Sequence, residues 1–234
     1  MKKVALLLVV VLAATVFGFA QECTSGTMAQ YTVTGFQCSI QDQTYQDFMY
    51  SSSSNPPGFS VPAGSVNVTP ITTTGNYGFQ WEAAGWAASN SSGVLSVDSL
   101  FQYAVSSTNP MTDLSLSIAG VGFSGTGSVS VDETACLGAM LPACSGGTTV
   151  TLRVFDSSSG QQLYDQVNFA GVNLIDVSKD LMVSAGTNGS AEVSVLTDQF
   201  SEGSGTVPEP STLSMFGAGI LALAGFARRK FNLF

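Results

Sequence analysis

The stretch Leu95-Ser-Val97-Asp-Ser-Leu-Phe101-Gln-Tyr103-Ala-Val105 decides the fold expected for this chain, because its odd-numbered positions are mostly apolar. Side chains of a β-strand point alternately to the two faces of a sheet, so this pattern predicts a strand with one buried face. The same alternation recurs in residues 77–81, 114–118, 129–131, 150–154 and 193–195. The chain therefore reads as a series of half-buried strands.

Clusters of Gly, Ser, Asn and Pro separate these strands, at residues 51–58, 89–93, 145–147, 157–160 and 187–190. Such clusters are turn signals at short spacing. Between the two ends of the chain, no stretch keeps a long 3.6-residue apolar period. We therefore predict an all-β fold, an antiparallel β-sandwich with jelly-roll-like connections, flanked by an N-terminal signal helix and a short hydrophobic C-terminal helix.

The N-terminus has the features of a secretory signal peptide. Met1-Lys2-Lys3 is basic, residues 4–19 are apolar, and Gly18 and Ala20 are small residues on either side of Phe19. This pattern predicts cleavage between Ala20 and Gln21 during export by the general secretion machinery. Residues 1–20 are then absent from the mature protein.

The C-terminus has three parts in a fixed order: Val207-Pro208-Glu209-Pro210, an apolar stretch at 213–227, and the basic stop Arg228-Arg229-Lys230. As a helix rising ~1.5 Å per residue, the apolar stretch reaches about 22 Å, less than the ~30 Å hydrocarbon core. We expect it to associate transiently with the inner membrane, with the basic residues kept in the cytoplasm by the positive-inside rule.

These features divide the chain into five parts. They are the signal peptide (1–20), an extracellular β-sandwich domain (21–200), a flexible Ser/Gly linker (201–206), a C-terminal segment with a hydrophobic span (207–230) and a cytoplasmic tail (231–234). The linker composition is typical of flexible spacers, so the Pro-Glu-Pro segment should be accessible.

The tail from Val207 to Lys230 resembles the PEP-CTERM sorting signal, also known as the ice-binding-protein C-terminal motif. The resemblance implies that exosortase, a membrane cysteine protease, reads the Pro-Glu-Pro motif and removes the tail. It also implies that the protein then joins the cell surface or the exopolysaccharide matrix. Residues 36–48 and 177–181 are similar to parts of other PEP-CTERM proteins, and this similarity implies no activity.

The predicted extracellular part is strongly acidic. Residues 21–206 contain Arg153 and Lys179 as their only basic residues against fifteen acidic ones, a net charge of −13. Nucleic acid and anionic lipid are therefore not expected as partners, because phosphate binding needs a basic surface. Cations or neutral glycans fit this charge better, and acidity by itself also keeps an exported protein soluble.

The four cysteines predict disulfides, since an even number in an exported chain is typical of oxidised pairs. Four cysteines allow three pairings, and we favour the two local ones, Cys23–Cys38 and Cys136–Cys144. Metal binding is disfavoured, because the chain has no histidine and no CxxC spacing.

No catalytic motif is found, and neither an enzyme nor a cofactor is expected. Without histidine the chain cannot form a Ser-His-Asp or Cys-His site, and it has no GxSxG elbow or Gly-rich phosphate loop. Paired carboxylates could hydrolyse glycosides, and calcium could bind oxygen ligands. The candidates for hydrolysis are Glu82, Asp98, Asp113 and Glu192. The candidates for calcium are two separate pairs, Asp132-Glu133 beside Cys136, and Asp42 with Asp47.

Aromatic residues are the last candidates for a binding surface. Tyr77, Phe79 and Trp81 are expected in the core, whereas Trp86, among small residues, is the candidate for an exposed platform that stacks on sugar rings. The leading hypothesis is a non-catalytic protein of the cell surface or of an exopolysaccharide matrix. The alternative is a secreted module that binds or cleaves carbohydrate.

Overall fold

The computed structural model describes residues 21–203 of the chain. The expected signal helix, the sorting motif and the hydrophobic stretch at 213–227 lie outside the described residues. Within residues 21–203, no helix has both the length and the apolar character that crossing a membrane requires.

The described chain is almost entirely strand, with one short helix, α2 (Met28–Tyr31), and two 3-10 turns, η1 (Ala63–Ser65) and η2 (Asn90–Ser92). The strands are β1 (Gln21–Glu22), β2 (Gly26–Thr27), β3 (Gln37–Ile40), β4 (Gln43–Asn55), β5 (Asn67–Thr73), β6 (Asn76–Glu82), β7 (Ala87–Ser89), β8 (Ser96–Ala119), β9 (Gly122–Gly125), β10 (Ser128–Leu137), β11 (Thr148–Ser157), β12 (Gly160–Gln162), β13 (Tyr164–Ser184), β14 (Gly189–Glu192) and β15 (Val195–Glu202). All their pairings are antiparallel except the short β1–β3 pair.

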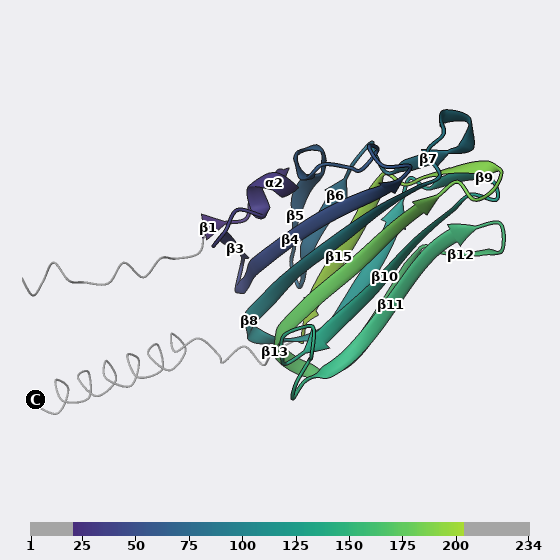
Figure 1. The fold of residues 1–234 in the computed structure, drawn as a ribbon. Helices are drawn as coiled ribbons and strands as arrows, with labels where there is room; N and C mark the ends of the chain where they lie inside the picture. The colour runs from purple at the N-terminus through teal and green to yellow at the C-terminus, as the bar shows by residue number, and fades with distance from the viewer. Residues whose placement is uncertain (1–20, 204–234) are drawn as a thin grey trace, which may run out of the picture.

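Two long strands, β8 and β13, build the sandwich by taking part in both of its layers (Figure 1). The first part of β8, residues 96–107, pairs with β4, whereas residues 111–119 pair with β15. β13 follows β8 along both parts, with register shifts between Asn168 and Leu174. The first layer therefore contains β12, β11, β10, β13, β8, β4, β3 and β1, and the second contains the other ends of β13 and β8 with β15, β6, β5 and β2.

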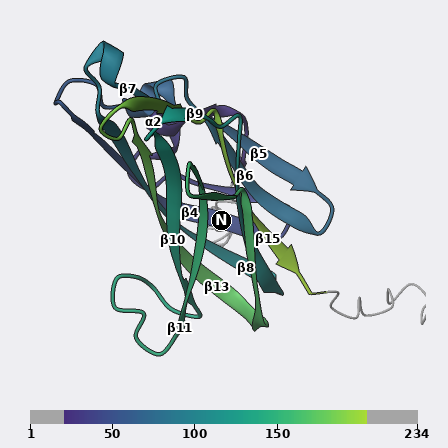
Figure 2. The same cartoon turned by 90° about the vertical axis from the view of Figure 1, so that its right-hand side faces the viewer.

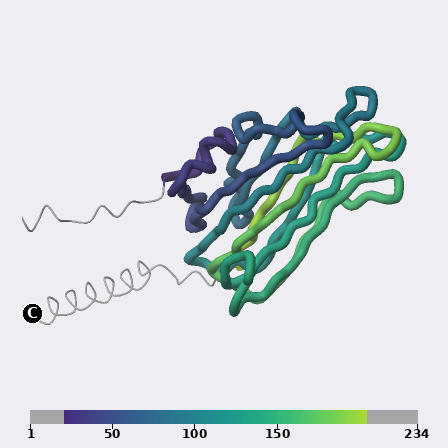
Figure 3. The backbone as a smooth tube through the Cα atoms, in the orientation of Figure 1, coloured from purple at the N-terminus to yellow at the C-terminus, as the bar shows by residue number. Residues whose placement is uncertain are grey.

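The two layers face each other across one core, as the view along the sandwich shows (Figure 2). The backbone trace shows the long strands of these layers lying side by side (Figure 3). Alternate residues of the long strands point into this core, including Phe101 and Tyr103 from β8, Phe79 and Trp81 from β6, and Phe200 from β15. Removing these rings from water is the main force that holds the layers together. The predicted all-β sandwich is confirmed.

The last strand, β15, is longer than expected and corrects the boundary of the linker. β15 ends at Glu202, so it includes two residues of the segment 201–206 that was predicted to be a flexible spacer. Ser201 is held because it pairs with Asp113 of β8 and Asn76 of β6, and its hydroxyl donates to Asn76 Oδ1 at 2.6 Å. The folded domain therefore extends beyond residue 200.

Both predicted disulfides are present in the structure. Cys23, which follows β1, is bonded to Cys38 of β3, and Cys136 of β10 is bonded to Cys144 in the loop between β10 and β11. Cys23 and Cys38 are also buried in the core. The first bond thus fixes the N-terminal edge of the described domain, where a chain end otherwise frays.

Replacing Cys23 and Cys38 together with serine should lower the free energy of unfolding by about 3 kcal/mol, because the bond closes a loop with a sequence separation of 15 residues. The matched variant, with Cys136 and Cys144 replaced, should lose about 2.5 kcal/mol, since its loop has a separation of 8 residues. Denaturant unfolding without reductant measures both. Unchanged stability in the first variant would contradict a structural role for that disulfide.

Candidate functional site

The four carboxylates considered for glycoside hydrolysis are not paired with one another. Glu82 lies on β6, Asp98 and Asp113 on the two ends of β8, and Glu192 on β14. None of them stands opposite another in the strand register: Asp98 faces Met182 and Ser53, and Asp113 faces Asn168 and Ser201. The fold does not assemble an acid and a base from these residues.

The prediction that Trp86 forms an exposed aromatic platform is wrong. Trp86 is only 1% exposed, and its indole nitrogen donates to Ser99 Oγ at 3.2 Å. Its ring packs edge-on against Phe101 at 6.0 Å between centroids. Trp86 follows a turn closed by the hydrogen bond from its amide to the Ala83 carbonyl at 3.4 Å, and at Gly85 in this turn a Cβ would lie 2.9 Å from Val61. Trp81 is also buried, so neither tryptophan can stack on a sugar at the surface.

The residues considered for calcium do not form an oxygen cage. Asp132 and Glu133 point to opposite faces of β10, because Asp132 is exposed beside Arg153 at 3.4 Å and Glu133 is fully buried. Asp42 accepts hydrogen bonds from Ser107 Oγ at 3.0 Å and from the side chain of Asn109 at 2.7 Å. Residues 21–203 contain no group of three or more Asp, Glu, Cys or His side chains arranged to hold a metal ion.

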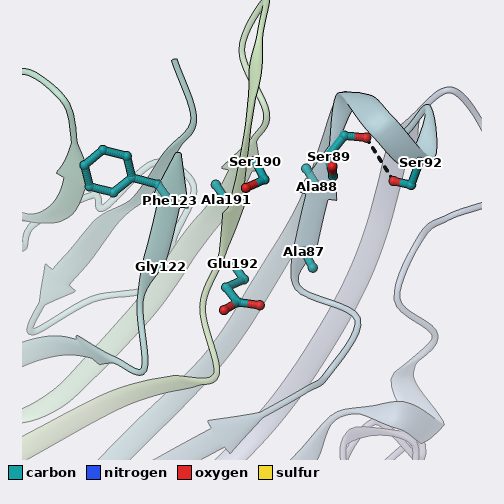
Figure 4. Close-up of a pocket in the computed structure, with 9 residues that line it drawn as sticks. All are labelled: Ala87, Ala88, Ser89, Ser92, Gly122, Phe123, Ser190, Ala191 and Glu192. Atoms are coloured by element: carbon teal, nitrogen blue, oxygen red, sulfur yellow. Dashed lines mark hydrogen bonds between the residues drawn. The ribbon is translucent and has the colours of Figure 1, made fainter. Parts of the chain in front are cut away.

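A surface hollow of about 420 Å³ lies over the small sheet of β7, β14 and β9 (Figure 4). Ser89, Ser92 and Ser190 line it with hydroxyl groups, and Glu192 is its single ionisable residue. Phe123 borders the hollow and is partly exposed, with its ring directed away from Glu192 (Figure 4). These groups suit contact with a neutral polar molecule, and they provide no pair of groups for acid–base chemistry.

A second hollow, of about 380 Å³, lies beside the loop that the Cys136–Cys144 bond closes. It contains two carboxylates, Asp47 and Asp176, between the exposed side chains of Met49 and Met140. Asp176 Oδ2 accepts a hydrogen bond from the Leu141 amide at 2.8 Å, and burial raises the pKa of this carboxyl group. This hydrogen bond holds the disulfide loop against β13, so Asp176 has a structural role.

The most unusual group of side chains lies inside the sandwich, where three charged residues are completely buried. Lys179 of β13 is directly opposite Glu133 of β10 in the strand register, and its Nζ lies 3.2 Å from Glu133 Oε2. From the other layer, Asp198 of β15 places its Oδ2 in contact with the same Nζ. All three side chains have no exposed surface. They are called the buried triad below.

Aromatic side chains enclose the buried triad. The Nζ atom of Lys179 lies 4.6 Å from the centre of the Tyr103 ring and 5.2 Å from that of Trp81. The Tyr103 hydroxyl donates to Asp198 Oδ2 and accepts from Lys179 Nζ at 3.2 Å. Gly78 lets β6 and β15 come close at this point, because a Cβ there would overlap the Asp198 carbonyl group. The site is therefore enclosed by side chains and closely approached by the backbone of β6.

The hydrogen bonds of the buried triad are incomplete. Neither oxygen of Glu133 accepts an aligned hydrogen bond, although Oε2 is within ion-pair distance of Lys179, and Asp198 Oδ1 has no partner. Burial and the nearby charge of Asp198 raise the pKa of Glu133 to about 8, despite the opposing effect of Lys179. At neutral pH Glu133 is therefore mostly protonated.

Comparison with protein families identifies the tail of the chain. The family model for the PEP-CTERM protein-sorting motif matches residues 206–230, which confirms the resemblance drawn from Val207–Lys230. The chain thus carries the sorting motif of exported proteins that exosortase delivers to the cell surface. The whole motif, including its Val-Pro-Glu-Pro segment and the basic stop, lies outside the described residues. The comparison with curated proteins finds no match.

Among solved structures, similarity is found to the complex of TmCBM61 with β-1,4-galactotriose, at 8% identity over 64% of this chain and 86% of that one, with a TM-score of 0.29. The enzymatically active domain of bacteriophage CBA120 tailspike protein 4 matches at 12% identity, over 68% and 19% of the chains, with a TM-score of 0.26. A structure of carbohydrate-binding modules from the β-sandwich superfamily matches at 5% identity, over 78% and 61%, with a TM-score of 0.27. At these values the similarities bear on neither ligand nor activity.

Proposed function

We propose that this protein is a non-catalytic component of the cell surface or of an exopolysaccharide matrix, and that exosortase releases it from its C-terminal tail. The observation that carries the proposal is the sorting motif at residues 206–230, which comes directly after a folded, disulfide-bonded domain. The tail serves as a substrate, and the catalytic groups that cleave it belong to exosortase.

A non-catalytic role agrees with the placement of the polar residues in the folded domain. The candidate acids lie apart on β6, β8 and β14, and the buried triad cannot reach a substrate because it has no exposed surface. The hydroxyl-lined hollow over β7, β9 and β14 is the surface at which a neutral polysaccharide would lie. Its single carboxylate, Glu192, fits binding better than hydrolysis, which needs two.

The proposal is tested by following the protein in a bacterial host with and without its exosortase gene. In the presence of exosortase, the protein should be recovered without residues after the cleavage point, in the surface or exopolysaccharide fraction. Without exosortase, it should remain in the membrane fraction at its longer length. C-terminal mass mapping of both fractions gives the result. Equal length and equal location in the two hosts would overturn the proposal.

A further inference from the structure

The buried triad joins the two layers of the sandwich through one pair of side chains. Lys179 belongs to β13 of the first layer and Asp198 to β15 of the second, and Lys179 Nζ contacts Asp198 Oδ2. As an ion pair this contact is a poor source of stability, because two charges must be taken out of water and Asp198 Oδ1 has no hydrogen bond. The amino group of Lys179 and the carboxyl group of Asp198, which together can form an amide bond, are already in contact.

We propose that the side chains of Lys179 and Asp198 form an intramolecular amide bond, with Glu133 as the acid–base group that moves the protons. A proton first passes from the Lys179 ammonium to the Asp198 carboxylate, which leaves a neutral amine and a neutral carboxyl group. The amine nitrogen attacks Asp198 Cγ, the new Nζ–Cγ bond forms, and one C–O bond breaks. One water molecule leaves, and no oxidant or other reactant is needed.

Burial favours each of these steps. Apolar surroundings penalise charged groups, so they favour the neutral amine and carboxyl group over the ion pair. Contact between the two groups replaces a collision in solution, an advantage that reaches about 10⁵–10⁸ M in effective concentration for well-aligned groups. The absence of exposed surface at Lys179 and Asp198 also keeps bulk water away from the product.

The neighbours of the pair supply the acid and base that acyl transfer requires. Glu133 Oε2 is 3.2 Å from Lys179 Nζ, so this protonated carboxyl group can give its proton to the leaving oxygen and take one back from the attacking nitrogen. Its raised pKa, about 8, keeps it able to do both near neutral pH. The Tyr103 hydroxyl donates to Asp198 Oδ2 and can stabilise negative charge that develops there.

The direct test is the mass of the exported wild-type protein, measured after reduction of its disulfides. The measured mass should be lower, by one water molecule, than the mass calculated from the sequence of the same chain. Trypsin should cut after Arg153 and fail after Lys179, because an acylated lysine is not a substrate. Cleavage at Glu192, which lies between the two residues in sequence, should leave the Lys179 peptide joined to the Asp198 peptide. Cyclisation of an N-terminal Gln21 would remove ammonia instead and would map to another peptide.

Three variants make the test specific. Glu133→Gln preserves the shape of the side chain. Its mass should equal the mass calculated from the sequence, trypsin should cut after Lys179, and circular dichroism should remain that of a folded sandwich. Asp198→Ala should also have the full calculated mass and the cut after Lys179, because it lacks the carboxyl group that would acylate this lysine. Arg153→Lys places a lysine beside exposed Asp132 and should form no second bond, so its mass should still differ by one water only.

Each other result overturns part or all of the proposal. A wild-type protein with its full mass and a normal cut after Lys179 would refute the bond. A cross-link from Lys179 to Glu133 would refute the choice of Asp198 as partner. Complete bond formation in the Glu133→Gln variant would refute the role of Glu133.

Discussion

Replacing Lys179 with methionine should lower the free energy of unfolding by about 3–5 kcal/mol, although methionine is apolar and of similar length. The substitution removes the partner of Asp198 and leaves a buried carboxylate without a cation, next to an incompletely bonded Glu133. The expectation holds for an ion pair and for an amide bond alike, since Asp198 loses its partner in both cases. Denaturant unfolding at neutral pH with intact disulfides measures the loss.

Arg153→Met is the matched control, because Arg153 and Lys179 are the only basic residues in the predicted extracellular part. Arg153 pairs with Asp132 at 3.4 Å, with side chains 63% and 59% exposed, so its loss should cost about 0–1 kcal/mol. Adding Asp198→Asn to Lys179→Met should recover part of the stability, because it removes the unpaired charge. Similar losses in the two single variants would show that burial of Lys179 has no energetic weight.

Changing Glu209 to alanine should block removal of the C-terminal tail while leaving the sandwich folded and exported. Glu209 is the one ionisable residue of the Val-Pro-Glu-Pro segment, and we expect a basic group of exosortase to bind it through a charge-assisted hydrogen bond. In a host with exosortase, the variant should accumulate as a longer, membrane-associated form. Cell fractionation with C-terminal mass mapping measures the length and the place of the product.

Two further variants separate recognition from anchoring. Glu202→Ala, also an acidic residue near the tail but within β15, should be processed like the wild type. Neutral replacements of Arg228, Arg229 and Lys230 should act differently, by removing the charges that keep the C-terminus in the cytoplasm. If the Glu209→Ala protein is processed and located like the wild type, the tail does not act as a sorting signal.

The sandwich was predictable from the sequence because alternation is a local signal that long strands repeat. Residues 96–105 form the first part of β8, and the local cysteine pairs could be preferred on spacing alone. Pairing between distant strands has no such signal. That β8 and β13 would bend through both layers depends on register shifts near Asn168 and Leu174. Asn109-Pro110 and Gly171 lie at these shifts, but such residues do not tell a bend within a strand from a turn between two strands.

The sequence carries a signal for the buried triad, because each of its residues occupies an inward position of a strand. Lys179 occupies the inward register between Val177 and Leu181, Glu133 follows Val129 and Val131 at the same period, and Asp198 lies between Leu196 and Phe200. Charged residues at inward positions are a signal in themselves, because a buried charge needs a partner. The net charge of the domain includes Lys179 but does not show that it points into the core. For Trp86 the sequence carries no such signal, because small neighbours do not determine whether a ring is buried or exposed.

The position of β15 also determines how the domain would bear a mechanical load. β15 is the last strand before the tail, yet it lies in the interior of its layer, hydrogen-bonded to β6 on one side and β8 on the other. Tension applied at Glu202 along the strand acts across hydrogen bonds that run perpendicular to it, so both ladders must shear together before the strand can move. A domain tethered through its C-terminus thus resists extraction far better than one whose last strand peels from a sheet edge.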